Sequence, residues 1–568
     1  MLGPSPTALL PDGHRPTGNA SKTAREALQI ATTAMATLHA ALWAHCLTAA
    51  RQMTEDGSDD ANTLSGLEGC GAPLVDLLRR QATQIVHLDD EDTGHVRRVN
   101  TALVARRLDD LIDIAHARFY AYAPSDVPDC WRHLYTDASI LLFALRWAAF
   151  WNNTARLSDD DLDNLVRPLD LALILAGGAG PPSRGHTWIH ASLDLLHSIL
   201  EEEDSGGDND EDAREEGPHP QKRRRLGGDG PKHPRTTPDF SAGPMFNEAD
   251  TNSAENTDNT ENSTFIPPVR HPVPCCGPLG LEEFQEYLDR DRGHSRTPLV
   301  LADMQDDWPA QQPGGRPWSS PAYLRWCTLR GRRLVPVEVG RSYVDAGWTQ
   351  AIVPMGDVLD HLTGRRQRRS EPPTAAGTGP MYLAQHTLFT QIPQLRHDIA
   401  IPDACYTTTQ TWVDDDDNDD YDDDRHSGSD AEAGADVLLH AWLGPAGTIT
   451  PLHTDPHHNL LAQVVGRKYV RLYAPANTPA LRPRGCEAGG VDMGNTSQVD
   501  VGVMEGWDAD AGGHDVDGEV TDDDKASFQS VPYMDCILGP GDTLYIPQGW
   551  WHYVRSLSVS FSVSFWWN

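Results

Sequence analysis

A polar, acidic stretch from residue 201 to residue 268 divides this 568-residue chain into two parts with different patterns. The stretch begins with Glu201-Glu-Glu-Asp, and Asn252-Ser-Ala-Glu-Asn-Thr-Asp-Asn follows later. Such segments bury too little apolar surface to offset the entropy lost on ordering, so we expect a disordered linker. Because a chain of this length is also too long for one hydrophobic core, separate domains are expected on its two sides.

Residues 1–200 have a helical pattern. Ala24 to Trp43 is rich in strong helix formers, with apolar residues three to four apart. A second apolar stripe lies between residues 96 and 122. This stripe comprises Leu103, Leu108, Leu111, Ile112 and Ile114. Ser158 before three aspartates is typical of a helix N-cap with an acidic first turn. We predict an all-α domain without a catalytic constellation, and expect it to bind another protein or act as a scaffold.

Residues 269–568 have a strand pattern instead. Short β-branched or aromatic runs alternate with glycine and proline turns, which is typical of a sandwich or barrel. These runs are 298–302, 334–339, 462–465, 469–473 and 559–565. Two acidic insertions, near 413–435 and 502–526, interrupt the pattern and are predicted to be surface loops. The whole chain is therefore predicted to be a multidomain α+β protein.

The net charge of -37 disfavours binding to nucleic acid through phosphates. The nine cysteines form no CxxC pair, which indicates reduced thiols in an intracellular compartment. We expect no signal peptide and no membrane span, since the N-terminus is interrupted by proline and no apolar run reaches ~18 residues. A basic cluster in the linker, Lys222-Arg-Arg-Arg225, is either a nuclear import signal or a chance run of charge. Nucleus, cytoplasm or both are expected locations.

The strongest chemical signal is His453-Thr-Asp455 together with the distant His552. On a strand, residues two apart lie on one face, so His453 and Asp455 can present two ligand atoms together. Two imidazoles and one carboxylate are the set used by non-haem Fe(II) oxygenases. Each histidine alone would more often be structural, and His87-Leu-Asp89 repeats the spacing in a context where we assign it no role. The glycine and proline turns around both elements favour metal binding by the three together.

Lys468 is the second chemical signal. In a strand it shares a face with Val470 and Leu472, where an ammonium group must pair or lose its charge. A bound dicarboxylate would supply the partner. An exposed position on an edge strand is an equally good interpretation of the spacing alone.

Several long motifs resemble a jumonji-C (JmjC) oxygenase domain, and most closely the jumonji domain-containing protein five group. The motifs are Ala441 to Asn459, Gly466 to Tyr473, Asn495 to Asp500, Trp551 to Arg555 and Ser560 to Trp567. The resemblance covers about residues 269–568, and the N-terminal half is more weakly similar to the same group.

The resemblance implies a double-stranded β-helix barrel of the cupin-like type, with flanking helices, that binds Fe(II) and 2-oxoglutarate and uses dioxygen. Matched by position, the implied iron ligands are His453, Asp455 and His552. The implied 2-oxoglutarate contacts are Lys468, Asn459, Tyr382 and Thr450. The implied substrate contacts are Trp442, Glu338 and Gln385.

Three functions remain open at this point. The first is hydroxylation of a protein side chain, with arginine favoured because Glu338 would suit a cationic substrate. The second is demethylation of histone methyl-lysine by the same oxygenase chemistry. The third is a scaffold with a relic barrel; a storage-protein or isomerase-type metal barrel is disfavoured by Lys468 and Asn459. The expected partner is a protein or peptide with a basic side chain, such as a histone or a ribosomal or chromatin-associated protein.

Overall fold

A computed structural model gives the fold of this chain. It describes residues 18–54, 66–89, 99–123, 126–151, 156–207, 240, 245–246, 265–290, 296–312, 316–345, 347–364, 379–408, 437–486, 492–509 and 521–568. The chain divides into two compact units, Met1–Gly230 and Pro231–Asn568. The division falls within the predicted linker, most of which lies outside the described residues, as do the basic cluster 222–225 and the predicted insertion 413–435.

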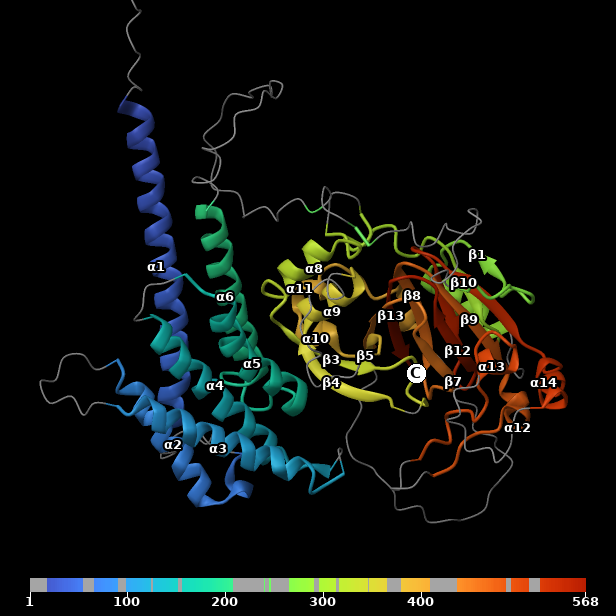
Figure 1. The fold of residues 1–568 in the computed structure, drawn as a ribbon, viewed down its shortest axis with the longest axis horizontal. Coiled ribbons are helices and arrows are strands. Elements are labelled where there is room, and N and C mark those ends of the chain that lie inside the picture. Colours follow the sequence, from blue (N-terminus) through green and yellow to red (C-terminus); the bar gives the residue numbers. More distant parts are fainter. Residues whose placement is uncertain are drawn as a thin grey trace, which may run out of the picture. The chain divides into compact units, whose positions relative to one another are not determined.

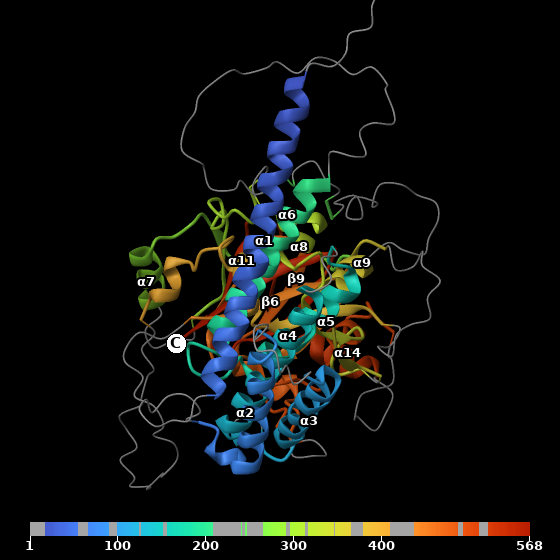
Figure 2. The same ribbon diagram turned by 90° about the vertical axis from the view of Figure 1, so that its left-hand side faces the viewer.

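The described part of the N-terminal unit is helical, as predicted. Its α-helices are α1 (Gly18–Thr54), α2 (Ala72–Val86), α3 (Thr101–Phe119), α4 (Asp129–Trp151), α5 (Asp159–Ala176) and α6 (His186–Gly207). Helix α4 packs against α1, α3 and α5, and its Phe143 and Trp147 are fully buried. Helices α1 and α6 lie side by side in both views (Figures 1 and 2). Ser158 caps α5 in a capping box with Asp161, which confirms the predicted N-cap.

The apolar stripe predicted on α3 is partly wrong. Leu103 and Ile114 are 48% and 37% exposed. The buried face consists of Val104, Leu108, Leu111 and Ala115. Spacings of four, three and four residues keep those side chains on one face, whereas Leu103 and Ile114 both lie on one flank of that face.

The C-terminal unit is built around two β-sheets. Its strands are β1 (Cys275–Cys276), β2 (Leu299–Leu301), β3 (Leu334–Val339), β4 (Thr349–Pro354), β5 (Met381–His386), β6 (Leu438–Gly444), β7 (Ile449–His453), β8 (His458–Val465), β9 (Lys468–Tyr473), β10 (Met534–Leu538), β11 (Thr543–Ile546), β12 (Trp551–Ser556) and β13 (Ser560–Trp567). One sheet has the order β1-β2-β11-β8-β13-β6-β5-β3-β4, and the other has the order β10-β9-β12-β7.

Short helices cover the outer faces of these sheets. They are α7 (Leu281–Arg290), α8 (Pro321–Cys327), α9 (Met355–Leu362), α10 (Leu388–Gln391), α11 (Pro393–Arg396), α12 (Thr478–Leu481), α13 (Val501–Met504) and α14 (Asp522–Gln529). Helices α8 to α11 lie beside the larger sheet, and α12 to α14 lie beside the smaller one (Figure 1). The range predicted as a second surface loop, 502–526, thus includes parts of α13 and α14; residues 510–520 lie outside the described residues.

The apolar core of the C-terminal unit has three layers. They follow from the alternation of side chains along the strands. Val470 and Leu472 of β9 belong to the layer between the two sheets, together with Leu461 of β8. Tyr469 and Tyr473, which alternate with them, pack on the outer side under α13 and α14. This arrangement confirms the predicted α+β fold with a C-terminal barrel and flanking helices. Within the described part of the chain, no helix is long and apolar enough to span a membrane.

Candidate iron and 2-oxoglutarate site

The two predicted histidine ligands lie opposite each other on neighbouring strands. His453 ends β7, His552 is the second residue of β12, and the antiparallel register pairs them directly. The turns before these strands contain Gly447 and Gly549 with φ of +84° and +75°, which glycine adopts without Cβ strain. Asp455 follows β7, and the ligand atoms of all three side chains lie within 4.8 Å of one another. The fold therefore brings together the three residues that the sequence pattern singled out.

Both imidazoles present the same nitrogen to Asp455. His453 Nε2 lies 3.7 Å from Asp455 Oδ1, and His552 Nε2 lies 3.4 Å from Asp455 Oδ2. The opposite nitrogens contact backbone carbonyls, His453 Nδ1 that of Pro451 at 2.8 Å and His552 Nδ1 that of Trp550 at 3.0 Å. Since a carbonyl only accepts, each Nδ1 carries the hydrogen and each Nε2 keeps a lone pair. Metal-binding histidines typically donate their other ring N–H to a backbone carbonyl in this way, which fixes the orientation of the ring.

The charge states of the cluster also suit a divalent metal. Burial lowers the pKa of His453 to about 4, and the neighbouring His552 lowers it further. Burial raises the pKa of Asp455, but its close contact with His552 and the nearby His453 outweigh that effect and bring it to about 2. At neutral pH the cluster thus offers a neutral imidazole at His453 and a carboxylate. These ligand types fit Fe(II) and leave other coordination positions for cosubstrate.

Lys468 lies in the same pocket, and its side chain is buried with 1% exposure. Its Nζ donates to Ser562 Oγ at 2.7 Å and to the Tyr382 hydroxyl at 3.4 Å. Within the described ranges, no carboxylate forms an ion pair with this ammonium group, and burial lowers its pKa to about 7. The alternative of an exposed lysine on an edge strand is wrong, because β9 lies between β10 and β12.

The other predicted cosubstrate contacts surround Lys468. Asn459 is 4% exposed, and among the residues that the structure describes its Oδ1 has no hydrogen-bond partner. The Thr450 hydroxyl hydrogen-bonds to Tyr382, and both side chains are buried. A buried amide oxygen without a partner is costly, so this site fits a ligand, or a ligand-held water, that can donate to Asn459.

One pocket connects the metal cluster with Lys468. Its lining comprises Tyr382, Trp442, Thr450, His453, Asp455, Asn459, Leu461, Lys468, Ile546, His552, Val554 and Ser564. The lining contains every predicted iron and 2-oxoglutarate contact. A pocket with apolar walls and a few convergent polar groups is the usual form of a small-molecule site.

Comparison with known proteins identifies the C-terminal half of the chain. The sequence profile of the family described as "Cupin-like domain" matches residues 285–568. The chain belongs to the cupin-like domain family. It is 38% identical over 307 residues to "Lysine-specific demethylase 8" of Danio rerio, covering 53% of this chain and 60% of that protein.

Two further relatives give the same assignment. "Lysine-specific demethylase JMJ30" of Arabidopsis thaliana is 39% identical over 290 residues, covering 51% of this chain and 53% of that protein. "Jumonji C domain-containing protein 5" of Drosophila melanogaster is 35% identical over 296 residues, covering 52% of this chain and 60% of that protein. The chain thus spans between about half and three fifths of the length of these curated relatives. Their names confirm the predicted resemblance to the jumonji-C group, whose domains use Fe(II), 2-oxoglutarate and dioxygen.

The three predicted substrate contacts occupy different places in this cupin-like domain. Trp442 lines the pocket and donates through Nε1 to Ser564 Oγ at 3.0 Å. Glu338 is not part of the lining. It does pair in register with Tyr382, and Tyr382 is part of the lining. Gln385 is exposed, lies outside the lining, and has φ of +46° where the pairing of β5 with β6 shifts register. Glu338 is therefore close to the pocket, whereas Gln385 is displaced by a β-bulge.

Sequence reasoning missed the serines of β13. In Ser560-Phe-Ser-Val-Ser-Phe565, the apolar residues pack into the core outside the larger sheet. The serines alternate with them, so that Ser562 accepts from Lys468 and Ser564 lines the pocket. Strict alternation of small hydroxyl and large apolar residues was the available signal. The cupin-like domain thus supplies a polar floor to its pocket from its last strand.

The second His-x-Asp pair has a structural role in the helical unit. Asp89 forms an ion pair with Arg51 at 3.1 Å and accepts from Trp43 Nε1 at 3.1 Å. Among the residues that the structure describes, His453, Asp455 and His552 form the one group of three metal-binding side chains. The spacing alone therefore does not identify the site, and the strand context does.

Proposed function

We propose that this protein is an Fe(II)- and 2-oxoglutarate-dependent oxygenase that hydroxylates a protein side chain, with arginine as the leading substrate. One observation carries the proposal. The buried ammonium group of Lys468, which has no carboxylate partner among the described residues, lines the same pocket as His453, Asp455 and His552. An unpaired buried cation is costly to maintain, and a dicarboxylate held at one end by a metal would compensate it at the other.

Each group of residues has a distinct task in this proposal. His453, Asp455 and His552 would hold the iron from one side, with both imidazoles oriented by their backbone hydrogen bonds. Lys468 and Tyr382 would hold the far carboxylate of 2-oxoglutarate, assisted by the polar groups of Asn459 and Thr450. When bound, iron and 2-oxoglutarate supply the oxidising chemistry that inserts one oxygen atom of dioxygen into a C–H bond. The apolar walls at Leu461, Ile546 and Val554 would limit the access of water.

Glu338 supports a basic substrate. It is partly buried on β3, and burial raises the pKa of its carboxyl group. A cationic side chain would favour the charged carboxylate and form a charge-assisted contact with it. Trp442 would add an aromatic wall that can stack on a guanidinium group.

Demethylation of a methyl-lysine is the second candidate, because two of the relatives carry the name lysine-specific demethylase. Those names describe the relatives. Hydroxylation of an N-methyl carbon would give a hemiaminal that releases formaldehyde and leaves an N–H group. The outcome here depends on which carbon atom of the substrate faces the metal. We propose that the substrate is a histone or another nuclear protein and that the helical unit binds a further partner.

Turnover of 2-oxoglutarate tests the proposal. The full-length protein should convert 2-oxoglutarate to succinate with Fe(II), and basic peptides should stimulate the reaction. His453→Ala should abolish it, whereas His397→Ala, at an exposed position outside the pocket lining, should not. Activity that survives in His453→Ala would refute the ligand assignment, and failure to bind either iron or 2-oxoglutarate would favour a scaffold. In mass spectra, a gain of one oxygen supports hydroxylation and the loss of a methyl group supports demethylation.

A further inference from the structure

The loop between β3 and β4 lies at the metal end of the pocket. We call residues 340–345 the rim loop. Its Tyr343 is partly buried, and burial raises the pKa of its hydroxyl. The hydrogen bond with Thr496 opposes this rise, whereas the carboxylates of Glu338 and Asp455 add to it. The Tyr343 hydroxyl lies 3.4 Å from Thr496 Oγ1, and Thr496 forms an antiparallel bridge with His453. The rim loop therefore places Tyr343 beside the segment that pairs with the metal-ligand position His453.

An acidic segment runs along the same side of the barrel. We call residues 500–508 the acidic arm. The chain before it extends the smaller sheet beyond β7, because Ser497 N donates to Leu452 O at 2.8 Å and Thr454 N donates to Asn495 O at 2.9 Å. The acidic arm thus continues from a segment paired with the strand that ends in His453.

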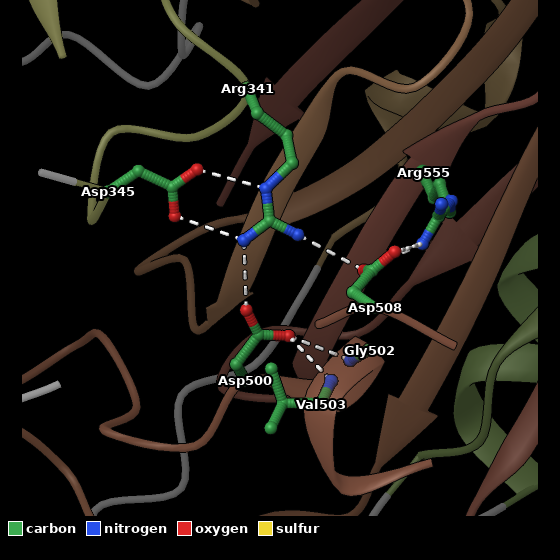
Figure 3. Close-up of polar contacts among 7 residues, drawn as sticks. All are labelled: Arg341, Asp345, Asp500, Gly502, Val503, Asp508 and Arg555. Carbon is green, nitrogen blue, oxygen red and sulfur yellow. Dashed lines mark hydrogen bonds and ion pairs between the residues drawn. The ribbon is translucent and has the colours of Figure 1, made fainter. Parts of the chain in front are cut away.

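Arg341 joins the rim loop to the acidic arm (Figure 3). Within the rim loop, its Nε and Nη2 donate to the two carboxylate oxygens of Asp345 at 2.9 and 3.1 Å. Across to the arm, Nη2 donates to Asp500 at 3.2 Å and Nη1 donates to Asp508 at 3.1 Å. One guanidinium group therefore makes four hydrogen bonds to three carboxylates, two of them bidentate to Asp345, whereas a lysine has only three donors and no planar fork.

Arg555 ties the same network to the metal-binding strands. It lies on β12, three residues after His552, and its Nη1 donates to both oxygens of Asp508 at 3.0 and 2.8 Å. All five charged side chains are largely buried, with exposures from 10% to 27%. Burial would lower the pKa of Arg341, yet the hydrogen bond to Asp345 and the other two carboxylates raise it instead. The network therefore joins the rim loop, the acidic arm and β12 through two guanidinium groups.

The acidic arm is held tightly enough to serve as a fixed support. Asp500 accepts from the backbone of Gly502 at 2.8 Å and of Val503 at 3.2 Å (Figure 3). A Cβ atom at Gly502 would collide with the Asp508 carboxylate, so only glycine permits this close approach. Glu505 of the arm is buried against Arg471 of β9 at 2.6 Å. The arm is thus fixed to the barrel independently of the rim loop.

We propose that Arg341 is a positioning residue that locks the rim loop against the acidic arm and so presents Tyr343 and Glu338 to the peptide substrate. The inference rests on the proposed function of the pocket. Preorganising a binding loop removes the cost of ordering it when the substrate arrives, so its loss weakens substrate use without touching the metal. Among the described residues, no hydrogen bond or ion pair joins the Arg341 side chain to the metal cluster or to Lys468; its partners lie in the rim loop and the acidic arm.

The test compares three variants of the full-length protein with a matched control. Arg341→Gln breaks the link directly, Asp345→Asn weakens it from the rim loop, and Gly502→Ala displaces Asp508 from the arm. The control is Arg325→Gln. Arg325 of α8 is equally exposed, at 27%, and forms an ion pair at 2.7 Å with Asp360 of α9. The probes are an unstructured peptide with one central arginine and the same peptide with trimethyl-lysine. Succinate release is measured with and without each peptide.

In the three variants, KM for the peptide that wild type uses should rise about ten- to hundredfold, while kcat changes much less. Affinity for 2-oxoglutarate and peptide-independent turnover should stay near wild type in the folded variants. Their thermal midpoints should fall, because each substitution breaks largely buried charge contacts. In Arg325→Gln, affinity for 2-oxoglutarate, peptide-independent turnover and the peptide KM should all stay near wild type. Arg341→Gln combined with Gly502→Ala should be no worse than either change alone, because both break one network. An unchanged peptide KM in folded Arg341→Gln, or a parallel loss of peptide-independent turnover, overturns the inference. A wild-type protein without any 2-oxoglutarate turnover refutes the proposed function instead.

Discussion

Two buried cations on the same strand differ in how their charge is compensated. Lys468 and Arg471 of β9 are each 1% exposed. Arg471 forms an ion pair with Glu505 at 2.6 Å and lies over the rings of Tyr533 and Trp507, at 4.0 and 4.9 Å from their centroids. Lys468 has two hydroxyl partners and no carboxylate within the described ranges. Three residues apart, the two side chains take opposite faces of the strand.

The difference separates a structural charge from a functional one. Burial would lower the pKa of Arg471, but its tyrosine and glutamate neighbours raise it, so the folded protein itself satisfies this charge. Burial lowers the pKa of Lys468 to about 7 without an opposing carboxylate. A cation left uncompensated by the fold, in a pocket that also has three metal-binding side chains, is best explained by a ligand that completes it.

Removing the carboxylate beside Arg471 should have the largest effect on stability. Glu505→Gln leaves a buried guanidinium group without its counter-charge, which costs about 3–5 kcal/mol. Denaturant unfolding monitored by tryptophan fluorescence measures this loss. The same substitution at Glu286, whose pair with Arg290 is 72–75% exposed, should change the unfolding free energy by less than about 1 kcal/mol. Equal effects at the two positions would show that Arg471 does not need its partner.

Removing the charge of Lys468 should produce the opposite result. Lys468→Met leaves no charged partner uncompensated among the described residues and removes the cost of burying an ammonium group, so stability should stay constant or rise. Affinity for 2-oxoglutarate should fall about ten- to hundredfold, because a charge-assisted hydrogen bond contributes about 1.5–3 kcal/mol. Calorimetric titration with 2-oxoglutarate measures this, and Lys525→Met on α14 is the matched control. Wild-type affinity in Lys468→Met would contradict the assignment of this residue to the cosubstrate.

The lowered pKa of Lys468 predicts opposite pH dependences for binding and stability. Only the protonated amine attracts a carboxylate, so affinity for 2-oxoglutarate should decrease as pH rises through about 7, by up to about tenfold per pH unit. Above that pH the unfolded chain binds a proton that the folded chain has released, so this residue adds stability as pH rises from about 7 towards its ordinary pKa of 10.5. Lys468→Met should remove both slopes, and a slope that persists in this variant would assign it to another group.

The sequence predicted the metal cluster better than it predicted the surroundings of the two cations. His453, Asp455 and His552 stand next to glycine and proline turns, which are local signals. The alternation of β9 also predicted that Val470 and Leu472 share a face. Whether that strand lies at an edge depends on pairing with β10, which comes much later in the chain. Local patterns therefore predicted faces of strands but not their neighbours.

Long-range charge pairing was the part that local patterns could not predict. The acidic range 502–526 reads as a solvated loop, yet Glu505 and Asp508 face Arg471 and Arg555 from distant strands. The displacement of Gln385 has the same origin, since a β-bulge leaves no distinctive mark in Tyr382-Leu-Ala-Gln385. The carboxylate that pairs with a buried arginine, and the residue at which a strand shifts register, depend on contacts between segments far apart in the sequence.

The smallest expected effect isolates the hydroxyl that supports Lys468. Ser562→Ala removes the acceptor at 2.7 Å from Nζ, and a single hydrogen bond contributes about 0.5–1.5 kcal/mol, so affinity for 2-oxoglutarate should fall about two- to tenfold. Ser560→Ala is the matched control, because Ser560 is buried on the same face of β13 and accepts from Gln463 instead. If both changes reduced affinity equally, the effect would come from packing of β13. A loss confined to Ser562→Ala, and absent when Lys468 is already methionine, would show that the serine acts through the uncompensated cation.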